Sequence, residues 1–175
     1  MEDCRDLDVN YLHREGLLQP GRWVTLSWCR ERERTASTGI KTYTGAVEHG
    51  RCRQGDDMVQ IYRALLEADG IVLGSPIYMG YVTAQTKLFM DRLFAFLRPG
   101  LNSIFPPGKK FVMVYSQGGG DDREMIHGLV QRLGRILGMQ VKGIAGGNGM
   151  NDLNTVKSNN ALLEEAFRLG KELVG

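Results

Sequence analysis

From residue 56 onward, apolar residues at helical spacing alternate along the chain with short apolar runs. The helical spacing predicts helices over 56–69, about 83–98 and 121–137, and a terminal helix that reaches residue 174. The runs at 71–73, 109–115 and 141–145 are typical of buried parallel strands. This order predicts a doubly wound parallel α/β sheet, in which the helices serve as right-handed crossovers.

The first 55 residues do not continue this pattern. Residues 22–28 alternate and are rich in β-formers, which predicts a strand, and 8–18 has the spacing of a short helix. All three cysteines and both tryptophans precede residue 56, whereas 17 of the 23 glycines lie from Gly70 onward. We therefore divide the chain into an atypical N-terminal segment, residues 1–49, and a second unit, residues 50–175.

Charge and cysteine content narrow the possible function. A net charge of +2 gives no general attraction for nucleic acid or an anionic membrane. No apolar run approaches the roughly 20 residues of a membrane helix, and the acidic start MEDCRDLDVN does not resemble a secretory signal. The cysteines form no C-x-x-C pair, which argues against a disulfide framework and a zinc site. We expect a cytoplasmic protein with reduced thiols and no bound metal.

Two loops at strand ends are built for close approach to a ligand. Residues 74–81 and 116–122 each follow a predicted strand and contain glycine. In doubly wound sheets, ligands bind beyond the carboxyl ends of the strands. Glycine lets a flat ligand reach the backbone, whose N–H groups are hydrogen-bond donors. We predict a ligand site where these two loops meet.

The stretch from residue 50 to 92 carries a specific set of motifs. It reads G-R-C-R-Q-G-D-D-M and then L-L-E-A-D-G-I-V-L-G-S-P-I-Y-M-G-Y-V-T-A-Q-T-K-L-F-M-D-R. This resembles the flavodoxin-like NAD(P)H-dependent FMN reductases, and most closely their iron–sulfur flavoprotein branch. The family pattern is G-S-P-x-Y-x-G followed by K-x-x-x-D-R, whose places are taken here by Lys87, Asp91 and Arg92. With S-Q-G-G-G at 116–120, the resemblance covers residues 50–175.

The resemblance implies an FMN-dependent oxidoreductase that passes electrons from NADH or NADPH to a quinone, flavin or similar small acceptor. It places the ribityl chain and the ring of FMN against the first loop, at Ser75, Pro76, Ile77, Tyr78, Met79 and Gly80. It places the pyrimidine side of the ring against Ser116, Gln117, Gly118 and Gly119. Because the flavin carries the chemistry, we name no catalytic side chain. Related reductases commonly complete the pocket across a dimer interface, so the resemblance also implies a homodimer.

The chain departs from the family pattern in two places. Members begin with a strand and a phosphate loop of the type S-P-R-x-x-S/G-x-T or T-x-T-G-x-T, and residues 35–42, T-A-S-T-G-I-K-T, are only a near match. The iron–sulfur branch has four clustered cysteines before the D-D-M helix, and only Cys52 stands in a matching place. Since a cubane cluster takes four thiolates, we expect no iron–sulfur cluster.

Two other functions stay open on the sequence alone. The near match at residues 35–42 allows a non-catalytic or defective relative that lacks the phosphate loop. The R-E-R-E-R run at 30–34 allows a nucleic-acid-binding protein, although a solvated turn explains mixed charges better. We expect Lys87 and Arg92 to form ion pairs with Asp91 or with neighbouring chains rather than to contact substrate.

Overall fold

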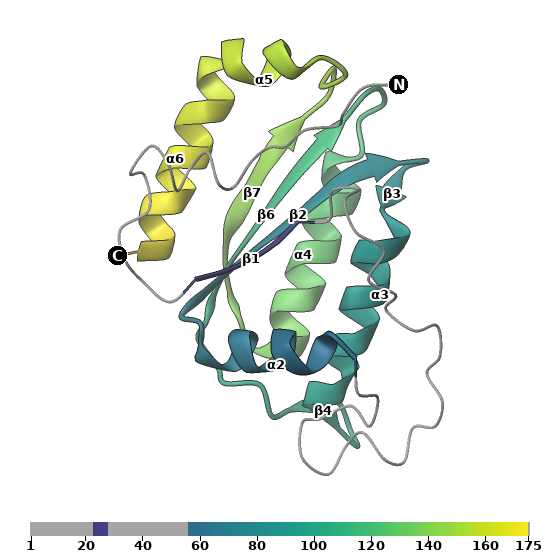
Figure 1. Cartoon of the computed structure of the whole chain (residues 1–175), viewed down its shortest axis with the longest axis vertical. Coiled ribbons are helices and arrows are strands. Elements are labelled where there is room, and N and C mark those ends of the chain that lie inside the picture. The colour runs from purple at the N-terminus through teal and green to yellow at the C-terminus, as the bar shows by residue number, and fades with distance from the viewer. Residues whose placement is uncertain (1–22, 28–55, 175) are drawn as a thin grey trace.

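The fold is built on a parallel sheet, which the computed structural model describes together with its helices for residues 23–27 and 56–174. Its strand order is β1 (Trp23–Ser27), β2 (Gly70–Tyr78), β6 (Lys110–Gln117) and β7 (Gln140–Gly147). The two-residue strand β3 (Tyr81–Val82) pairs antiparallel with the end of β2. Figure 1 shows the sheet edge-on between helices. The predicted doubly wound parallel sheet is confirmed, and so is the predicted strand near residues 22–28.

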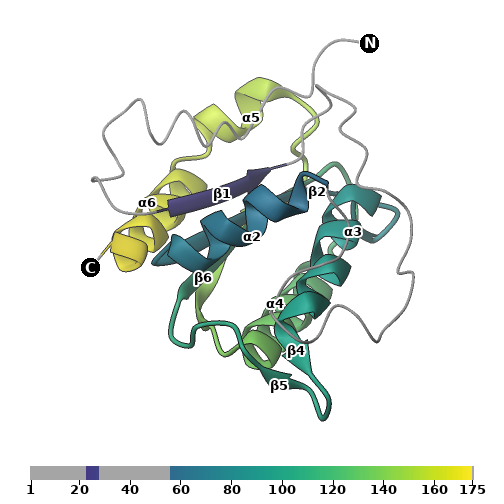
Figure 2. The same ribbon diagram turned by 60° about the horizontal axis from the view of Figure 1, so that its bottom comes forward.

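Helices cover both faces of this sheet (Figures 1 and 2). On one face lie α2 (Met58–Glu67), α3 (Ala84–Arg92) and α4 (Arg123–Leu137). On the other face, the short helix α5 (Leu153–Ser158) leads into α6 (Asn160–Val174). Alternate strand residues serve the two cores: Ile71 and Leu73 pack toward α2, whereas Val72 packs toward α6. The apolar residues recur at helical spacing in the sequence because each helix buries one stripe of its surface against the sheet.

The predicted helix over 83–98 is too long. The α-helix ends at Arg92, a 3-10 turn, η1 (Leu93–Phe96), follows, and a small hairpin of β4 (Leu97–Arg98) and β5 (Asn102–Ser103) completes the segment. Pro99 disfavours helical backbone at the residue before it, so the chain is extended at Arg98. The stretch 93–97 is almost uniformly apolar, and the tight turn buries Leu93 and Phe96 together.

The first predicted buried strand, 71–73, is in fact the first part of a longer one. β2 continues through Pro76 to Tyr78, and Pro76 pairs in register with Ser116 of β6. Pairing with β1 ends at Gly74, so beyond this point β2 has a described parallel neighbour on one side only. Proline is tolerated in such edge positions, because none of the described strands on that side needs its missing N–H. The predicted loop at 74–81 is therefore strand as far as Tyr78, and only the turn at Met79 and Gly80 is not paired within the sheet.

Charged side chains hold both ends of α2, through an ion pair at its start and hydrogen bonds to carbonyl oxygens at its end. The N–H of Met58 donates to Asp56 Oδ1 at 3.1 Å, so Asp56 rather than Asp57 caps the helix. Arg92 donates to both carboxylate oxygens of Asp56, at 2.6 and 3.0 Å, and both side chains are largely buried. At the other end, the buried Lys109 ammonium donates to the carbonyl oxygens of Leu66 and Ala68.

The predicted ion pair of Lys87 with Asp91 is confirmed, whereas Arg92 pairs with Asp56 instead. Lys87 Nζ lies 2.5 Å from Asp91 Oδ1, one helical turn further along the exposed side of α3.

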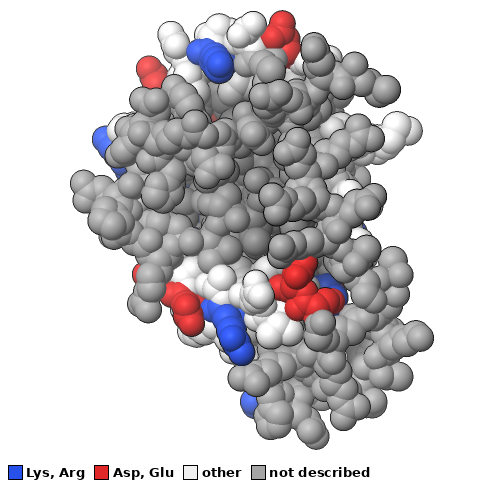
Figure 3. Space-filling view, in the orientation of Figure 1, with Lys and Arg blue, Asp and Glu red and all other residues white. Residues whose placement is uncertain are grey.

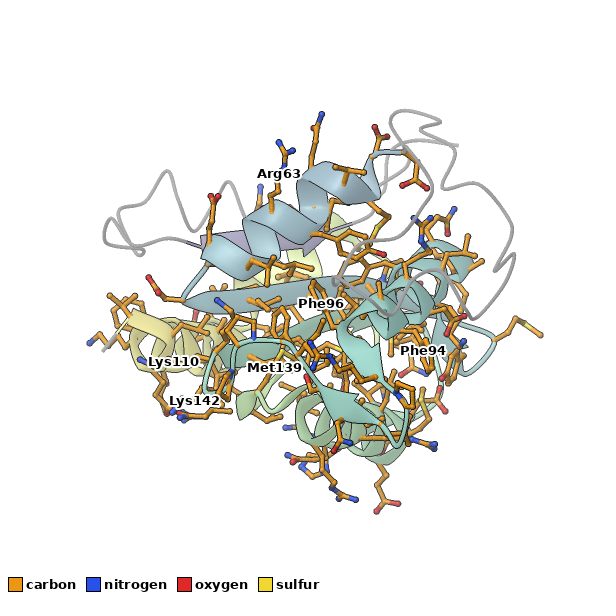
Figure 4. All side chains as sticks on the ribbon, turned by 90° about the horizontal axis from the view of Figure 1, so that it is seen from below. Arg63, Phe94, Phe96, Lys110, Met139 and Lys142 are labelled. Atoms are coloured by element: carbon orange, nitrogen blue, oxygen red, sulfur yellow. The ribbon has the colours of Figure 1, made fainter. Side chains whose placement is uncertain are left out.

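In the view from below (Figure 4), Phe96 and Met139 lie in the packed interior, while Lys110 and Lys142 lie at the end nearest α6. None of the helices in the described ranges is long and apolar enough to cross a membrane.

β7 contains an irregularity that sets which way its later residues face. Phe111 of β6 pairs with Val141, but the next residue, Val112, pairs with Gly143. Lys142 is thus an extra residue in β7, as in a β-bulge. Beyond it, Ile144 packs with the α2–α4 core and Ala145 with the α6 core.

Candidate functional site

The two predicted loops lie side by side. The strands that carry them are hydrogen-bonded neighbours up to their carboxyl ends, where Ile77 pairs with Gln117. Beyond that pair, the loops approach each other again: a Cβ placed on Gly80 would be 3.7 Å from Asp122 Oδ1. Residues 74–81 and 116–122 therefore form one continuous edge at the carboxyl end of the sheet.

The first loop ends in a tight hairpin with exposed apolar side chains. Tyr78 pairs with Tyr81, and the two residues between them have positive φ, +52° at Met79 and +76° at Gly80. Positive φ at both central positions identifies a type I′ turn, which normally takes Asn, Asp or Gly. Met79 is fully exposed and Tyr78 is 57% exposed. We call residues 78–81 the exposed hairpin tip.

We expect Met79→Asn to raise the free energy of unfolding by about 0.5–1 kcal/mol, because asparagine tolerates left-handed backbone better than methionine. Urea unfolding followed by circular dichroism measures this. Met79→Ala is the matched control, since it removes the same apolar side chain and keeps a backbone that is strained for an L-residue. Equal stability of the two variants would contradict the assignment of strain to Met79.

Buried hydroxyl groups hold the base of the first loop. Ser75 Oγ donates to the Pro76 carbonyl oxygen at 2.8 Å. It accepts hydrogen bonds from the Thr83 N–H at 3.2 Å and from Thr86 Oγ1 at 3.1 Å. Thr83 in turn caps α3. Ser75 and Ile77 are both buried, so their side chains serve the fold, and only their backbone is placed for a ligand.

The second loop is shaped by a buried amide. Gln117 Nε2 donates to the Gly119 carbonyl oxygen at 2.7 Å and to Asp122 Oδ2 at 2.5 Å, and Gln117 Oε1 accepts from the Asp122 N–H at 3.4 Å. Asn151 Nδ2 donates to the Gly118 carbonyl oxygen at 3.4 Å. No hydrogen bond joins the N–H groups of Gly119 and Gly120 to another residue within the described ranges. These two N–H groups are therefore available to a ligand.

A third loop, 146–151, belongs to the same edge, although it was not among the predicted ligand loops. Gly147 pairs with Ser116, the half-buried first residue of the second loop. The Met150 N–H donates to the Gln117 carbonyl oxygen at 3.0 Å. The loop follows the last predicted strand, so the strand-end rule that selected the other two loops applies equally to it.

Tyr115 packs tightly beside this edge. It pairs with Gly146, and a Cβ on that glycine would lie 2.2 Å from the Tyr115 carbonyl oxygen and 2.4 Å from its ring atom Cδ1. Burial raises the pKa of Tyr115 above its ordinary value, and nearby Arg123 opposes part of that rise. Tyr115 is therefore neutral at physiological pH, and its buried side chain packs against Gly146.

Other predicted features lie outside the described residues. These are the short helix at 8–18, the near match to a phosphate loop at 35–42, the 30–34 charge run, and Cys52. Within the described ranges, no three His, Cys, Asp or Glu side chains come together as metal ligands. On the face in Figure 3, the described acidic and basic side chains are interspersed.

Comparison with known proteins gives a consistent set of matches. The profile of a family described as NADPH-dependent FMN reductase matches residues 29–145. An iron-sulfur flavoprotein of Archaeoglobus fulgidus is 30% identical over 148 residues, which cover 78% of this chain and 65% of that protein. One from Methanocaldococcus jannaschii is 53% identical over 45 residues, 26% of this chain and 23% of that protein. The matches span less than two thirds of the length of these relatives.

Solved structures agree on the fold. A crystal structure of an NADH:FMN oxidoreductase in its apo form has a TM-score of 0.54 and 16% identity. The similarity covers 71% of this chain and 61% of the oxidoreductase chain. An FMN-dependent NADH-azoreductase from Bacillus anthracis, in complex with FMN, has a TM-score of 0.54 and 16% identity. The similarity covers 67% of this chain and 62% of the azoreductase chain. At these identities the similarity is one of fold.

Proposed function

The chain belongs to the NADPH-dependent FMN reductase family, and from this premise we propose that it is an FMN-dependent oxidoreductase. The proposed reaction passes electrons from NADH or NADPH to a quinone, flavin or similar small acceptor. The observation that supports it most is the pair of available N–H groups at Gly119 and Gly120, beside the exposed hairpin tip.

The residues at this edge fit a flat, partly polar ring. No atom of the described residues lies within 4 Å of the position that a Cβ would take on Gly119, so these residues leave room for a ring to approach the backbone there. Across the edge, Tyr78 presents an exposed aromatic side chain to pack on the ring. The side chains of Ser75, Ile77 and Gln117 are buried, so the contacts expected from these residues are backbone contacts or indirect ones.

Each part of the chain would have a limited task in the reaction. FMN, when bound, supplies hydride acceptance and electron transfer. The N–H groups of Gly119 and Gly120 would bind the pyrimidine side of the ring and stabilise negative charge that develops there. Tyr78 and Met79 would cover one part of the ring and keep water from it. No side chain is needed as a general acid in this scheme.

Binding of FMN tests the proposal directly. We expect the purified chain to quench the fluorescence of added FMN with a Kd of about 1 μM or tighter. Fluorescence titration measures this, and oxidation of NADPH in the presence of a quinone then tests turnover. Riboflavin, which lacks the phosphate, is the matched control ligand, and weaker binding of riboflavin would indicate a phosphate site in this chain.

The alternative function predicts different results. A defective relative without a phosphate site would bind FMN and riboflavin equally weakly, or would leave FMN fluorescence unchanged. Failure to quench FMN at 100 μM protein, roughly a hundred times the expected Kd, would overturn the proposed function.

We also propose that this member carries no iron–sulfur cluster and forms a homodimer. The relatives named iron-sulfur flavoproteins carry that cluster in their names, whereas this chain has only three cysteines in all. A cubane held by one chain takes four thiolates. Iron and acid-labile sulfide analysis tests the first proposal, and light scattering with and without FMN tests the second.

A further inference from the structure

Gln117 lies at the centre of the second loop but is not exposed to a ligand. Its side chain is only 4% exposed. Its amide nitrogen donates to the Gly119 carbonyl oxygen and to Asp122 Oδ2. A Cβ placed on Gly120 would lie only 3.0 Å from the same nitrogen, Gln117 Nε2. A ring placed on the loop would therefore meet the glycine backbone, with Gln117 behind it.

The hydrogen bonds behind the loop determine where its N–H groups point. A peptide unit is planar and trans, so the C=O of one residue and the N–H of the next point in opposite directions. Gln117 holds the Gly119 carbonyl oxygen, which directs the Gly120 N–H away from Gln117. In the same way, Asn151 holds the Gly118 carbonyl oxygen, which directs the Gly119 N–H away from Asn151.

We propose that Gln117, assisted by Asn151, is a positioning residue that presents the N–H groups of Gly119 and Gly120 to the pyrimidine side of the flavin. This inference rests on the proposed function. It changes the role of Gln117 from a direct contact with the flavin to a residue that holds the second loop in place. Glutamine suits the task because one carboxamide offers two donors and one acceptor. Here both donors and the acceptor are used, and Asp122 both accepts from the amide and donates to it.

One charged group contacts this amide, and others lie on the adjoining segments of the chain. Asp122 contacts it directly, and Asp121 precedes Asp122 on the same loop. At the start of α4, Arg123 forms a 3.6 Å ion pair with Glu165 of α6. On the third loop, Asp152 accepts from the Asn154 N–H at 2.8 Å. Asp122 is thus the group whose charge a carboxylate at position 117 would meet first.

Gln117→Glu tests the inference, because it keeps the size of the side chain and removes both N–H donors. At about pH 8 the new carboxylate would repel Asp122 and release the Gly119 carbonyl oxygen, and we expect FMN affinity to fall about tenfold or more. Near pH 5 the new carboxyl group, with its pKa raised by Asp122, would be protonated and donate one hydrogen bond, so part of the affinity returns. Wild-type affinity should change less over the same range.

The control is Gln131→Glu, the same chemical change on the exposed side of α4, which should leave FMN affinity unchanged at both pH values. Chemical unfolding of each variant shows that affinities are compared between folded proteins. In the FMN-free wild type, NMR should find the Gln117 side-chain N–H protons protected from exchange with solvent. Rapid exchange of those protons would overturn the inference without any use of FMN.

If Gln117→Glu does not fold, Asn151→Ala carries the test, because Asn151 is exposed and its loss should leave stability nearly unchanged. We expect a weaker effect of about threefold to tenfold on FMN affinity, since its bond to Gly118 is long. A folded Gln117→Glu protein, or Asn151→Ala in its place, that binds FMN as wild type does would overturn the inference and leave the proposed function standing. A wild-type chain that does not bind FMN would instead overturn the proposed function.

Discussion

Gly146→Ala is expected to lower the free energy of unfolding by about 3 kcal/mol or more, which makes Gly146 the most sensitive single position near the site. The new Cβ would lie 2.2 Å from a backbone oxygen of the neighbouring strand, and a backbone atom cannot rotate away as the end of a side chain can. Relief would require β7 to move away from β6, at the cost of strand pairing beside the site. Urea unfolding followed by circular dichroism measures the loss.

Gly119→Ala is the matched control for this prediction. Gly119 stands on the adjacent loop, and no atom in the described part of the chain lies within 4 Å of its prospective Cβ. Its φ is not in the left-handed region, so alanine fits without strain there. The control should change stability by no more than about 0.5 kcal/mol. A Gly146→Ala protein as stable as this control would show that β6 and β7 can separate more easily than the packing implies.

Arg92→Met is expected to destabilise the protein by about 3 kcal/mol at neutral pH, because it leaves the Asp56 carboxylate largely buried without its cation. The Arg92 guanidinium holds the pKa of Asp56 below its ordinary value, with burial acting in the opposite direction. In the wild type, this pair therefore contributes stability above the unfolded-state pKa of an aspartate, near 3.9, and loses it as the pH falls through the lower folded-state value.

The variant should respond to pH in the opposite sense. Without Arg92, burial raises the pKa of Asp56, so protonation relieves the penalty as the pH falls. The difference in stability between wild type and Arg92→Met should be largest at pH 7 and should narrow toward pH 4. Lys87→Met, which breaks the exposed Lys87–Asp91 pair, is the control and should cost about 0.5 kcal/mol or less. A difference for Arg92→Met that does not vary with pH would contradict this account of Asp56.

The sequence predicted the layers of this fold well because each of its long helices buries a single stripe. α4 shows this most clearly, with Ile126, Val130 and Leu137 buried on one side. The spacing could not predict how the chain behaves at 93–98, where nearly every residue is apolar and no stripe is defined. There, Pro99 and the surrounding core select a tight turn and a hairpin instead of more helix.

The position of the site was likewise easier to predict than the role of each residue in it. The strand-end rule located two of the three loops, since it depends only on where apolar runs stop. Whether a polar residue such as Ser75 or Gln117 faces in or out depends on its partners. Those partners, Thr86 for Ser75 and Asp122 for Gln117, lie 11 and 5 residues further along the chain. No periodic pattern records such pairs.

The extra residue in β7 makes the length of that strand as important as its composition. Side chains alternate between the two faces of a regular strand, and the extra residue therefore puts Val141 and Gly143, two positions apart, on opposite faces. Loss of Lys142 would remove the bulge and make Val141 and Gly143 consecutive residues of a regular ladder, with Gly146 still paired with Tyr115. Relatives that share this site can therefore lack a residue at the position of Lys142, whereas a single deletion between Gly143 and Gly146 would turn the later side chains over, and an alignment that places a gap there should be doubted.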